Sequence, residues 1–175
     1  MIVYIISAVV ILFLSYGFYQ ANQLTHIEIE KQVTIDGSQQ EVFDMVKYLE
    51  NYPKWSPFLE ADPEQKYEVK GIDGATGVQF HWNGNGGKDL GYQEIVKIED
   101  LKFVGVRCTI EKPFKANPTF DYTFSSTSQG TLLTQDFTLN SGIVDAFFMW
   151  LFGAEKEMAQ MNERGLVLLK NHLEM

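Results

Sequence analysis

The chain has 175 residues and a formal net charge of -9, which fits one domain plus an appended segment. No cluster of Lys and Arg stands out, which argues against a nucleic-acid partner because phosphates require concentrated positive charge. The single cysteine, Cys108, excludes an intrachain disulfide and lies in an apolar stretch, where a small buried side chain is expected.

The N-terminal segment Met1–Tyr19 has no charged side chain. As a helix it would be roughly 28 Å long, close to the hydrocarbon thickness of a bilayer. A cleaved signal peptide is the alternative, but it needs a basic residue before the apolar region and small residues at the cleavage point, where Tyr16–Gln20 is bulky. We therefore predict a retained single-pass transmembrane anchor over residues 1–20. Lys31, the first Lys after it, favours the cytoplasmic side for the rest of the chain.

A polar tether over residues 21–26 leads into a predicted strand over Ile27–Ile35, in which apolar and polar side chains alternate. Lys31 falls on the apolar face, so we expect either a bulge or an edge position there. A short helix follows, because Ser38 and Glu41 have the spacing of a capping box, in which each side chain bonds the other residue's backbone N–H.

The predicted domain, residues 27–175, continues with six more strands and a long helical region. Short polar loops join the strands, which indicates an antiparallel meander. From Asp145 the apolar period becomes helical and stays so to the C-terminus, with Gly165 as either a kink or a point of close approach. The predicted strands are Tyr67–Lys70, Val78–Trp82, Gln93–Ile98, Phe103–Ile110, Thr119–Ser125 and Leu132–Leu139.

Several short motifs follow one another along this domain. They are Asn51–Phe58 (Asn-Tyr-Pro-Lys-Trp-Ser-Pro-Phe), Asp62–Glu64, Gly71–Gly77, Phe80–Asn85, Gly130–Thr131 and Gly165–Glu174. In this order, after a strand and a capped helix, they resemble the polyketide cyclase/dehydrase-like (SRPBCC) branch of the START/Bet v1-like superfamily. The resemblance covers roughly Glu28–Glu174. It implies an α+β helix-grip fold, in which a curved antiparallel sheet wraps around a long C-terminal helix and holds one small apolar molecule.

The strand pattern also predicts a ligand cavity. Alternation places many aromatic side chains on one face of the sheet, and one long helix covers only part of a curved sheet. The resemblance implies the same cavity, and the alternative is that these side chains simply fill the space. The residues expected to contact a ligand are Phe80, Trp82, Tyr92, Val106, Tyr122, Phe124, Gln135, Phe137, Trp150 and Met158.

Four of the polar side chains have specific expectations. Gln135 falls on the apolar face and can supply a polar contact, and Tyr92 and Tyr122 can donate to a ligand carbonyl. Glu94 is ambiguous, since it shares a face with apolar neighbours. A buried Glu94 would have a raised pKa and act as an acid or base, whereas a Glu at the rim in water would have neither property.

No metal, cofactor or catalytic site is predicted. The histidines His26, His81 and His172 lie far apart and in different elements, without the spacing of a zinc site. There is no Gly-x-Ser-x-Gly elbow. The glycine-rich run Asn83–Gly87 joins two strands, so it is interpreted as a hairpin loop and not as a phosphate-binding loop.

Two functions are compatible with these observations. The first is membrane-tethered binding of a small hydrophobic ligand, such as a lipid, a quinone or a polyketide-like molecule. The alternative is a cyclase/dehydratase-type enzyme that acts on such a molecule, and the lack of a convergent acid–base set favours binding. A co-chaperone-like interaction domain is less favoured, because that role does not require an anchor. The identity of the ligand and the oligomeric state stay open.

Two local expectations concern aromatic side chains. Trp55 should be buried under the first helices, with the flanking prolines fixing its approach. The apolar run Ile143–Gly153 should lie near the bilayer and guard the entrance to the cavity, because a helix cannot turn all of its large side chains toward the sheet. Phe148 and Phe152 are the expected outward pair. The alternative is that neighbouring loops cover them.

Overall fold

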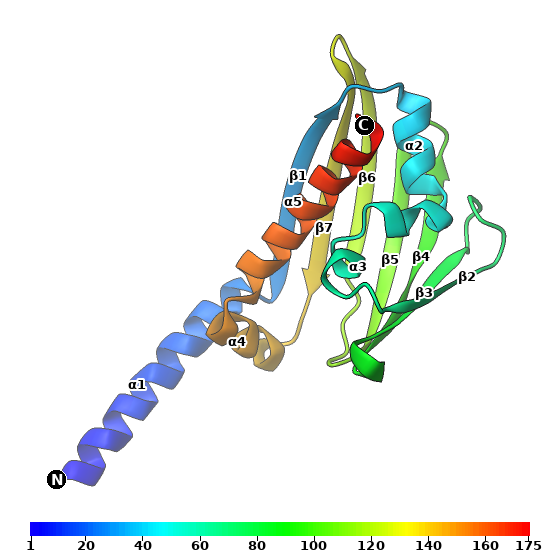
Figure 1. Ribbon diagram of the computed structural model, residues 1–175. Helices are drawn as coiled ribbons and strands as arrows, with labels where there is room; N and C mark the ends of the chain where they lie inside the picture. Colours follow the sequence, from blue (N-terminus) through cyan, green and yellow to red (C-terminus); the bar gives the residue numbers. More distant parts are fainter.

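The computed structural model describes residues 1–175 and contains one curved, seven-stranded antiparallel sheet (Figure 1). The strand order is β1-β7-β6-β5-β4-β3-β2. Strands β2 to β7 form a meander, and the last strand, β7, also pairs with the first strand, β1, which is an edge of the sheet. The strands are β1 (His26–Ile35), β2 (Lys66–Lys70), β3 (Gln79–Gly84), β4 (Asp89–Glu99), β5 (Phe103–Lys112), β6 (Thr119–Thr127) and β7 (Gly130–Asn140). The predicted antiparallel meander is confirmed.

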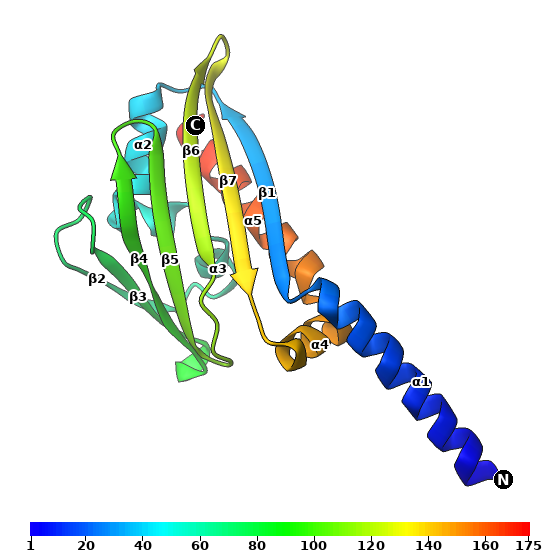
Figure 2. The same ribbon diagram turned by 180° about the vertical axis from the view of Figure 1, so that it is seen from behind.

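Helices α2, α3 and α5 lie on one face of this sheet. Figure 1 shows α2, α3 and α5 in front of the strands, and Figure 2 shows the opposite face without helices. The helices are α1 (Ile2–Gln23), α2 (Gln39–Lys47), η1 (Leu49–Lys54), α3 (Pro57–Ala61), η2 (Asn85–Gly87), α4 (Ile143–Phe152) and α5 (Ala154–Leu173). The expected α+β helix-grip fold, with its long C-terminal helix, is confirmed.

The capping box predicted at the start of α2 is present. The Ser38 hydroxyl accepts a hydrogen bond from the Glu41 backbone N–H at 3.3 Å, and the Glu41 carboxylate accepts from the Ser38 N–H at 2.9 Å. The two bonds satisfy backbone donors that a helix start leaves unpaired. They fix where α2 begins, so that Val42, Phe43 and Val46 are buried against the sheet.

The Pro-Lys-Trp-Ser-Pro corner, residues 53–57, buries Trp55 as predicted. Its side chain is 5% exposed, and its indole N–H donates to the Met45 carbonyl of α2 at 3.1 Å. Ser56 then caps α3 by accepting from the Leu59 N–H, and Pro57 occupies the first helical position, where its missing N–H has no effect on helix bonding. The corner therefore reverses the chain while it places a large aromatic side chain in the core.

Lys31 is accommodated by the edge position of its strand. The pairing of β1 with β7 continues without a register shift, so there is no bulge. Because β1 is the outermost strand, the Lys31 ammonium can leave the apolar face and reach the Glu163 carboxylate of α5 at 2.9 Å. Of the two alternatives predicted for Lys31, the structure shows the edge position and not the bulge.

The C-terminal helical region is two helices and not one. Gly153 has φ 68° and ψ 29°, a left-handed conformation that favours glycine and ends α4 before α5 begins. The helical period predicted from Asp145 to the C-terminus is therefore divided between α4 and α5. Gly165 does not break α5. It is buried, and a β-carbon there would lie 3.5 Å from Cδ of Pro57, so it marks a close approach to the corner.

The N-terminal helix α1 extends away from the sheet (Figure 1). By length and composition it can cross a membrane, and only 6% of its most apolar window is buried, unlike the core helix of a soluble protein. The helix continues to Gln23, so only Leu24 and Thr25 separate it from β1. The connection to the domain is therefore shorter than the predicted tether over residues 21–26.

Candidate functional site

The inner, helix-covered face of the sheet gathers several of the expected ligand-contacting residues. Phe80, Val106, Tyr122 and Phe124 are buried together in the main apolar core. Trp55 joins them from the corner, with its ring centroid 6.2 Å from that of Tyr122. Leu166 and Leu169 of α5 close the core from the other side. We refer to this group as the first cluster.

A smaller apolar cluster lies at the end of the domain nearest α1, and we call it the second cluster. Its buried members are Ile27, Phe137 and Leu139. Leu24, Ile29, Ala116, Phe120, Met149 and Met158 pack against them. Two more of the expected residues, Phe137 and Met158, therefore meet here. Met149 and Met158 have flexible side chains that adapt easily to changes of shape.

Polar side chains lie between the buried members of the two clusters, and Phe120 packs against both clusters. Along β7, Gln135 lies between Leu133 of the first cluster and Phe137 of the second. Its register partners are Lys31 on β1 and Tyr122 on β6. Gln135 is buried, as expected for a residue on the apolar face.

Asn162 of α5 belongs to the same level of the fold. It lies one helical turn from Met158 of the second cluster and one turn from Leu166 of the first, so the three side chains share a helix face. Asn162 is 9% exposed, and its Nδ2 is buried without a hydrogen-bond partner. Leaving a buried donor unpaired costs about 1–3 kcal/mol. We call Lys31, Gln135 and Asn162 the polar layer.

The two core tyrosines, Tyr52 and Tyr122, act as neutral groups. Burial raises the pKa of the Tyr122 phenol well above its ordinary value, and burial is also the main cause of the raised pKa of Tyr52. Both hydroxyls therefore keep their protons at any physiological pH. They are suited to hydrogen bonding and not to accepting a proton from a substrate.

Three more of the expected residues lie away from the polar layer, although Trp82 packs against the first cluster. Tyr92 is paired with His81 on the opposite face of the sheet, where the two rings stack at 5.2 Å. Trp82 is on the inner face but only half-buried, and its ring lies over Gly91, where a β-carbon would clash with it. Trp150 packs between α4 and α1, 5.8 Å from the ring of Phe13. The structure does not bring these three residues to the polar layer.

The position of Glu94 is also settled. It is the register partner of Gln79, on the outer face with Tyr92, and its carboxylate accepts a hydrogen bond from the Gln79 amide at 2.7 Å. Glu94 therefore does not face the space between the sheet and α5. Of the two alternatives for Glu94, the structure shows the one in which its carboxylate is not buried in the interior.

Two surface hollows flank the sheet edge. The first, of about 200 Å³, lies between β1 and α5 beside the ion pair of Lys31 and Glu163. Its lining residues are Lys31, Gln32, Val33, Glu163, Leu166 and Val167. The second, of about 420 Å³, is on β1 and β7 and is lined by Glu28, Ile29, Glu30, Asp136, Phe137 and Thr138. The first hollow opens next to the polar layer.

The outer face carries a row of carboxylates across three strands. Asp136 on β7 is the register partner of Glu30 on β1 and of Asp121 on β6. Partial burial, and then the negative charges of Glu30, Asp121 and Glu28, raise the pKa of Asp136. Burial also raises the pKa of Asp121. The row has no metal-site geometry.

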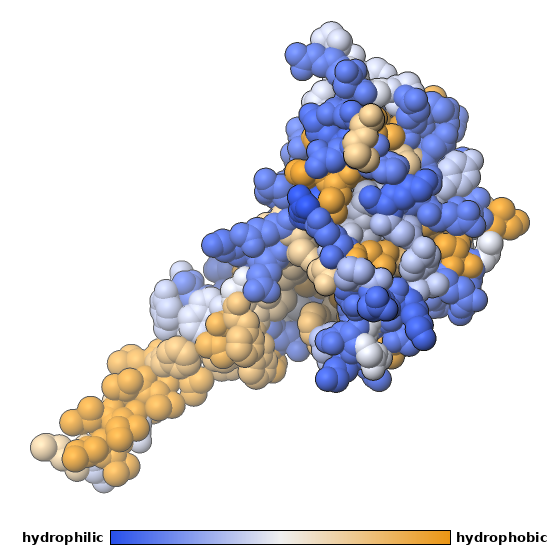
Figure 3. All heavy atoms as spheres, viewed as in Figure 1, coloured by the Kyte–Doolittle hydropathy of each residue, from blue (hydrophilic) through white to orange (hydrophobic).

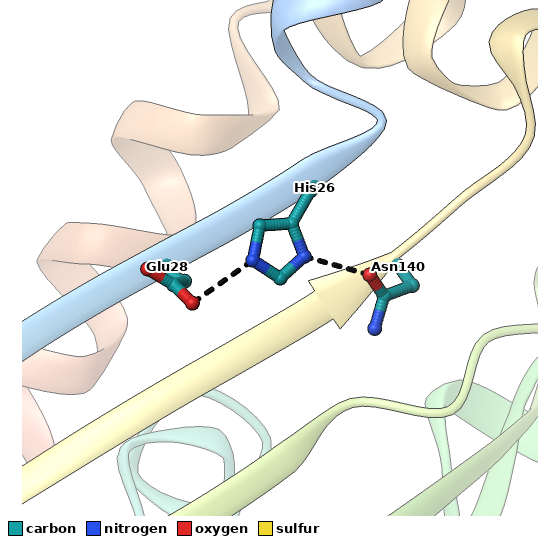
Figure 4. A network of polar contacts seen from close by, with 3 residues as sticks. All are labelled: His26, Glu28 and Asn140. Atoms are coloured by element: carbon teal, nitrogen blue, oxygen red, sulfur yellow. Dashed lines mark hydrogen bonds and ion pairs between the residues drawn. The ribbon is translucent and has the colours of Figure 1, made fainter.

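A polar contact ties the first strand to the last at the end nearest α1 (Figure 4). Nδ1 of His26 lies 2.7 Å from Oδ1 of Asn140, and Nε2 lies 2.9 Å from Oε1 of Glu28. Two acceptors are satisfied best by an imidazolium, so the Asn140 bond, followed by the Glu28 bond, raises the pKa of His26. The contact joins the first residue of β1 to the last residue of β7.

The inner face offers apolar surface and hydrogen-bond donors in place of an acid–base pair. Cys108 is on this face, but burial raises the pKa of its thiol to about 12, so it is not a thiolate nucleophile at neutral pH. Lys31 is engaged by Glu163. The polar groups that remain include Gln93, Gln135, Asn162 and the neutral phenols, which suit recognition of a carbonyl or carboxyl oxygen.

Solved structures similar to this chain share its fold at low sequence identity. Protein MLL2253 from Mesorhizobium loti is 13% identical with a TM-score of 0.64, over 85% of this chain and 97% of that one. The Aha1 dimer from Colwellia psychrerythraea is 14% identical with a TM-score of 0.56, over 85% and 97%. The di-domain ARO/CYC StfQ from the steffimycin biosynthetic pathway is 14% identical with a TM-score of 0.60, over 85% and 51%. Comparison with curated proteins gives no match.

One family covers the whole sheet-and-helix domain. Residues 26–174 match the family described as polyketide cyclase / dehydrase and lipid transport. The match begins at the first residue of β1 and ends one residue after α5, so it leaves α1 outside. Its description indicates either binding of a hydrophobic ligand or a cyclase-type role. The chain belongs to the polyketide cyclase/dehydrase and lipid transport family.

Proposed function

We propose that the protein binds one small hydrophobic ligand that carries a hydrogen-bond acceptor, between the sheet and α5, and that α1 tethers it to a membrane. The observation that carries this proposal is the unpaired amide of Asn162, buried at the level where the core divides into two apolar clusters. Buried polar groups are almost always paired, so a free donor at this place calls for an acceptor. A ligand carbonyl or carboxylate supplies one.

The surroundings of the polar layer suit the rest of such a ligand. Phe137 and Met158 present apolar surface on one side, and Tyr122 lies next to Gln135 on the other. The hydrocarbon part of a ligand gains about 25 cal/mol for each Å² removed from water. A ligand can therefore place its acceptor against the Asn162 amide and its apolar body along the second cluster, where it packs against Met158.

The second cluster is also where we place the entrance. Met149 of α4 and Leu24, which follows α1, both pack against it. This end of the domain is the one that the anchor holds nearest to a bilayer (Figure 1). A ligand taken up there moves between lipid and protein with little exposure to water. The assignments of a retained anchor over residues 1–20 and of the cytoplasmic side stay predictions.

A cyclase-type reaction is the second candidate. It has support from the family description and from the likeness of the fold to StfQ, an ARO/CYC protein. Such chemistry needs a group that takes up a proton from the substrate. The buried phenols and the Cys108 thiol stay protonated, and Glu94 points away, so the inner face favours binding.

The proposal is tested by titrating the full-length protein in detergent with cis-parinaric acid, a fluorescent fatty acid. Asn162→Leu removes the donor and keeps the site apolar. Asn171→Leu makes the same change on an exposed part of α5 and serves as the control. Loss of one hydrogen bond, about 1 kcal/mol, weakens binding roughly fivefold in the first variant and leaves the second unchanged. Equal affinities, or no saturable signal above that of empty micelles, would contradict the proposal.

A further inference from the structure

The short helix α4 packs along the C-terminal half of α1. The ring centroid of Phe147 lies 4.9 Å from that of Phe18, and the Trp150 ring lies 5.8 Å from Phe13 and 5.9 Å from Tyr16. As the chain advances from Phe147 to Trp150, its contacts move back along α1 toward the N-terminus. The two helices therefore run in opposite directions.

This contact sets the depth of α4 if α1 crosses a bilayer. With a rise of about 1.5 Å per residue, Phe13 lies roughly 17 Å and Phe18 roughly 24 Å along the helix from Ile2. The hydrocarbon layer is about 30 Å thick, so α1 needs nearly its whole length to span it. The contact points on α1 then fall in the half of the layer nearer the domain. A helix packed against them cannot lie in bulk water.

The surface that α4 turns away from the protein is apolar. The exposed side chains are Ile143, Val144, Phe148, Leu151 and Phe152. Figure 3 shows the hydrophobic surface of α1 continuing into the region where α4 adjoins it. The loops do not cover Phe148 and Phe152, which are 51% and 73% exposed. The sequence-based choice of these two as the outward pair is confirmed.

Charged residues at both ends define how α4 lies. Asp145 in the first turn is its only charged residue, and Glu155, Lys156 and Glu157 begin α5 directly after Gly153. These side chains need water or lipid headgroups. With ten residues α4 is also too short to span the layer. An orientation at the boundary between headgroups and acyl chains satisfies all of these groups.

We infer that α4 is an interfacial membrane helix, which α1 holds in the leaflet nearer the domain with Phe148, Leu151 and Phe152 against lipid acyl chains. The contact is apolar in origin, because α4 has no basic residue to attract anionic headgroups. Met149, on another side of α4, packs against the second cluster. One helix therefore contacts both the bilayer and the end of the core that faces it. The inference depends on α1 spanning the membrane and not on the identity of a ligand.

The test uses the full-length protein in phosphatidylcholine liposomes. Phe152→Cys carries an NBD label, whose emission reports the polarity around it. Ile72→Cys, at the β2–β3 turn, is the control, since Ile72 is also a highly exposed apolar residue (79%). Native Cys108 is buried and does not compete for the label. Both substitutions are on the surface, and Val144→Cys gives a second position on α4.

The labels at residues 152 and 144 are expected to emit at shorter wavelength than the label at residue 72. Doxyl-labelled lipid should quench them, and aqueous iodide should quench them severalfold less than the label at residue 72. Iodide quenching equal to that at residue 72 would overturn the inference. Protection from both quenchers would show that a second protein surface covers α4, and would also overturn it. Neither result changes the titration with cis-parinaric acid, so the two proposals fail separately.

Discussion

Gly17 of α1 lies directly against the ring of Phe147 of α4, with no space for a side chain between the two helices. A β-carbon at residue 17 would clash with the Phe147 ring and lie 2.7 Å from Cζ3 of Trp150. Small residues let helices approach closely in membranes, where packing replaces the hydrophobic effect as the source of association. Helices α1 and α4 are thus fitted to each other at one residue.

Gly17→Val should separate the two helices. Overpacking of a close contact costs about 1–3 kcal/mol. We expect a lower unfolding temperature for the full-length protein in detergent, followed by tryptophan fluorescence, which includes Trp150. Ser15→Val introduces the same side chain at an exposed position of α1 and should have little effect. Equal shifts for the two variants would show that the contact does not stabilise the protein.

Trp55 is expected to be among the most sensitive positions of the core. Removing a buried Trp side chain costs about 3–5 kcal/mol, and Trp55→Ala also leaves the Met45 carbonyl without its indole donor. Trp82→Ala, at a half-buried position, should cost clearly less. Denaturant unfolding in detergent measures both. A loss below about 1 kcal/mol at Trp55 would show that the corner does not support the core.

Asp136→Asn should stabilise the protein at neutral pH. The raised pKa of Asp136 means that the folded state favours the protonated carboxyl. The stability contributed by that proton is present below the unfolded pKa of about 3.8 and is lost as the pH rises through the higher folded pKa. An amide mimics the protonated form at every pH. Like charges opposite each other on paired strands cost about 0.2–1 kcal/mol.

The gain from Asp136→Asn should therefore be visible at pH 7 and vanish near pH 3, in thermal unfolding measured across that range. Asp100→Asn, in an exposed turn, is the matched control and should be neutral. A variant that is less stable than the parent at pH 7 would mean that Asp136 makes a favourable contact that the carboxylate row does not reveal.

His26 should titrate above its ordinary pKa of 6.5, because its charged form has two acceptors. The bonds of the charged form contribute stability that is full below the unfolded pKa and is lost as the pH rises through the higher folded pKa. NMR of the imidazole protons in micelles measures the value. Asn140→Ala should lower it most and Glu28→Gln less. If the pKa of His26 is unchanged in Asn140→Ala, the contact in Figure 4 does not stabilise the charged imidazolium.

The sheet could be predicted from the sequence because its inner residues alternate with polar ones on most strands. The pattern failed where the inner face is not apolar. On β4 the inward residues include Gly91 and Gln93, so nothing in the pattern placed Tyr92 on the outside. A register shift between Ile95 and Lys97 also turns both Ile95 and Ile98 inward, which obscures the alternation around Glu94.

The polar layer could be predicted only in part. Gln135 was found because it interrupts an alternating strand. Asn162 interrupts the helical stripe from Met158 to Leu166 in the same way, but a single Asn on a helix is usually solvated, and only the structure shows that its amide is buried. The pairing of α1 with α4 depends on contacts between segments about 130 residues apart in the chain, which periodicity does not report.

A hydrophobic molecule bound at the polar layer is the feature that distinguishes the proposed function from a solid core. Native mass spectrometry of the full-length protein, released from mild detergent, tests it most directly. We expect a bound molecule of one chemical class, soluble in organic solvent, on the parent protein and on Asn171→Leu, and its loss or strong reduction on Asn162→Leu. A parent protein that always appears at its bare mass, or a bound molecule that Asn162→Leu retains in full, would show that the polar layer does not hold a ligand.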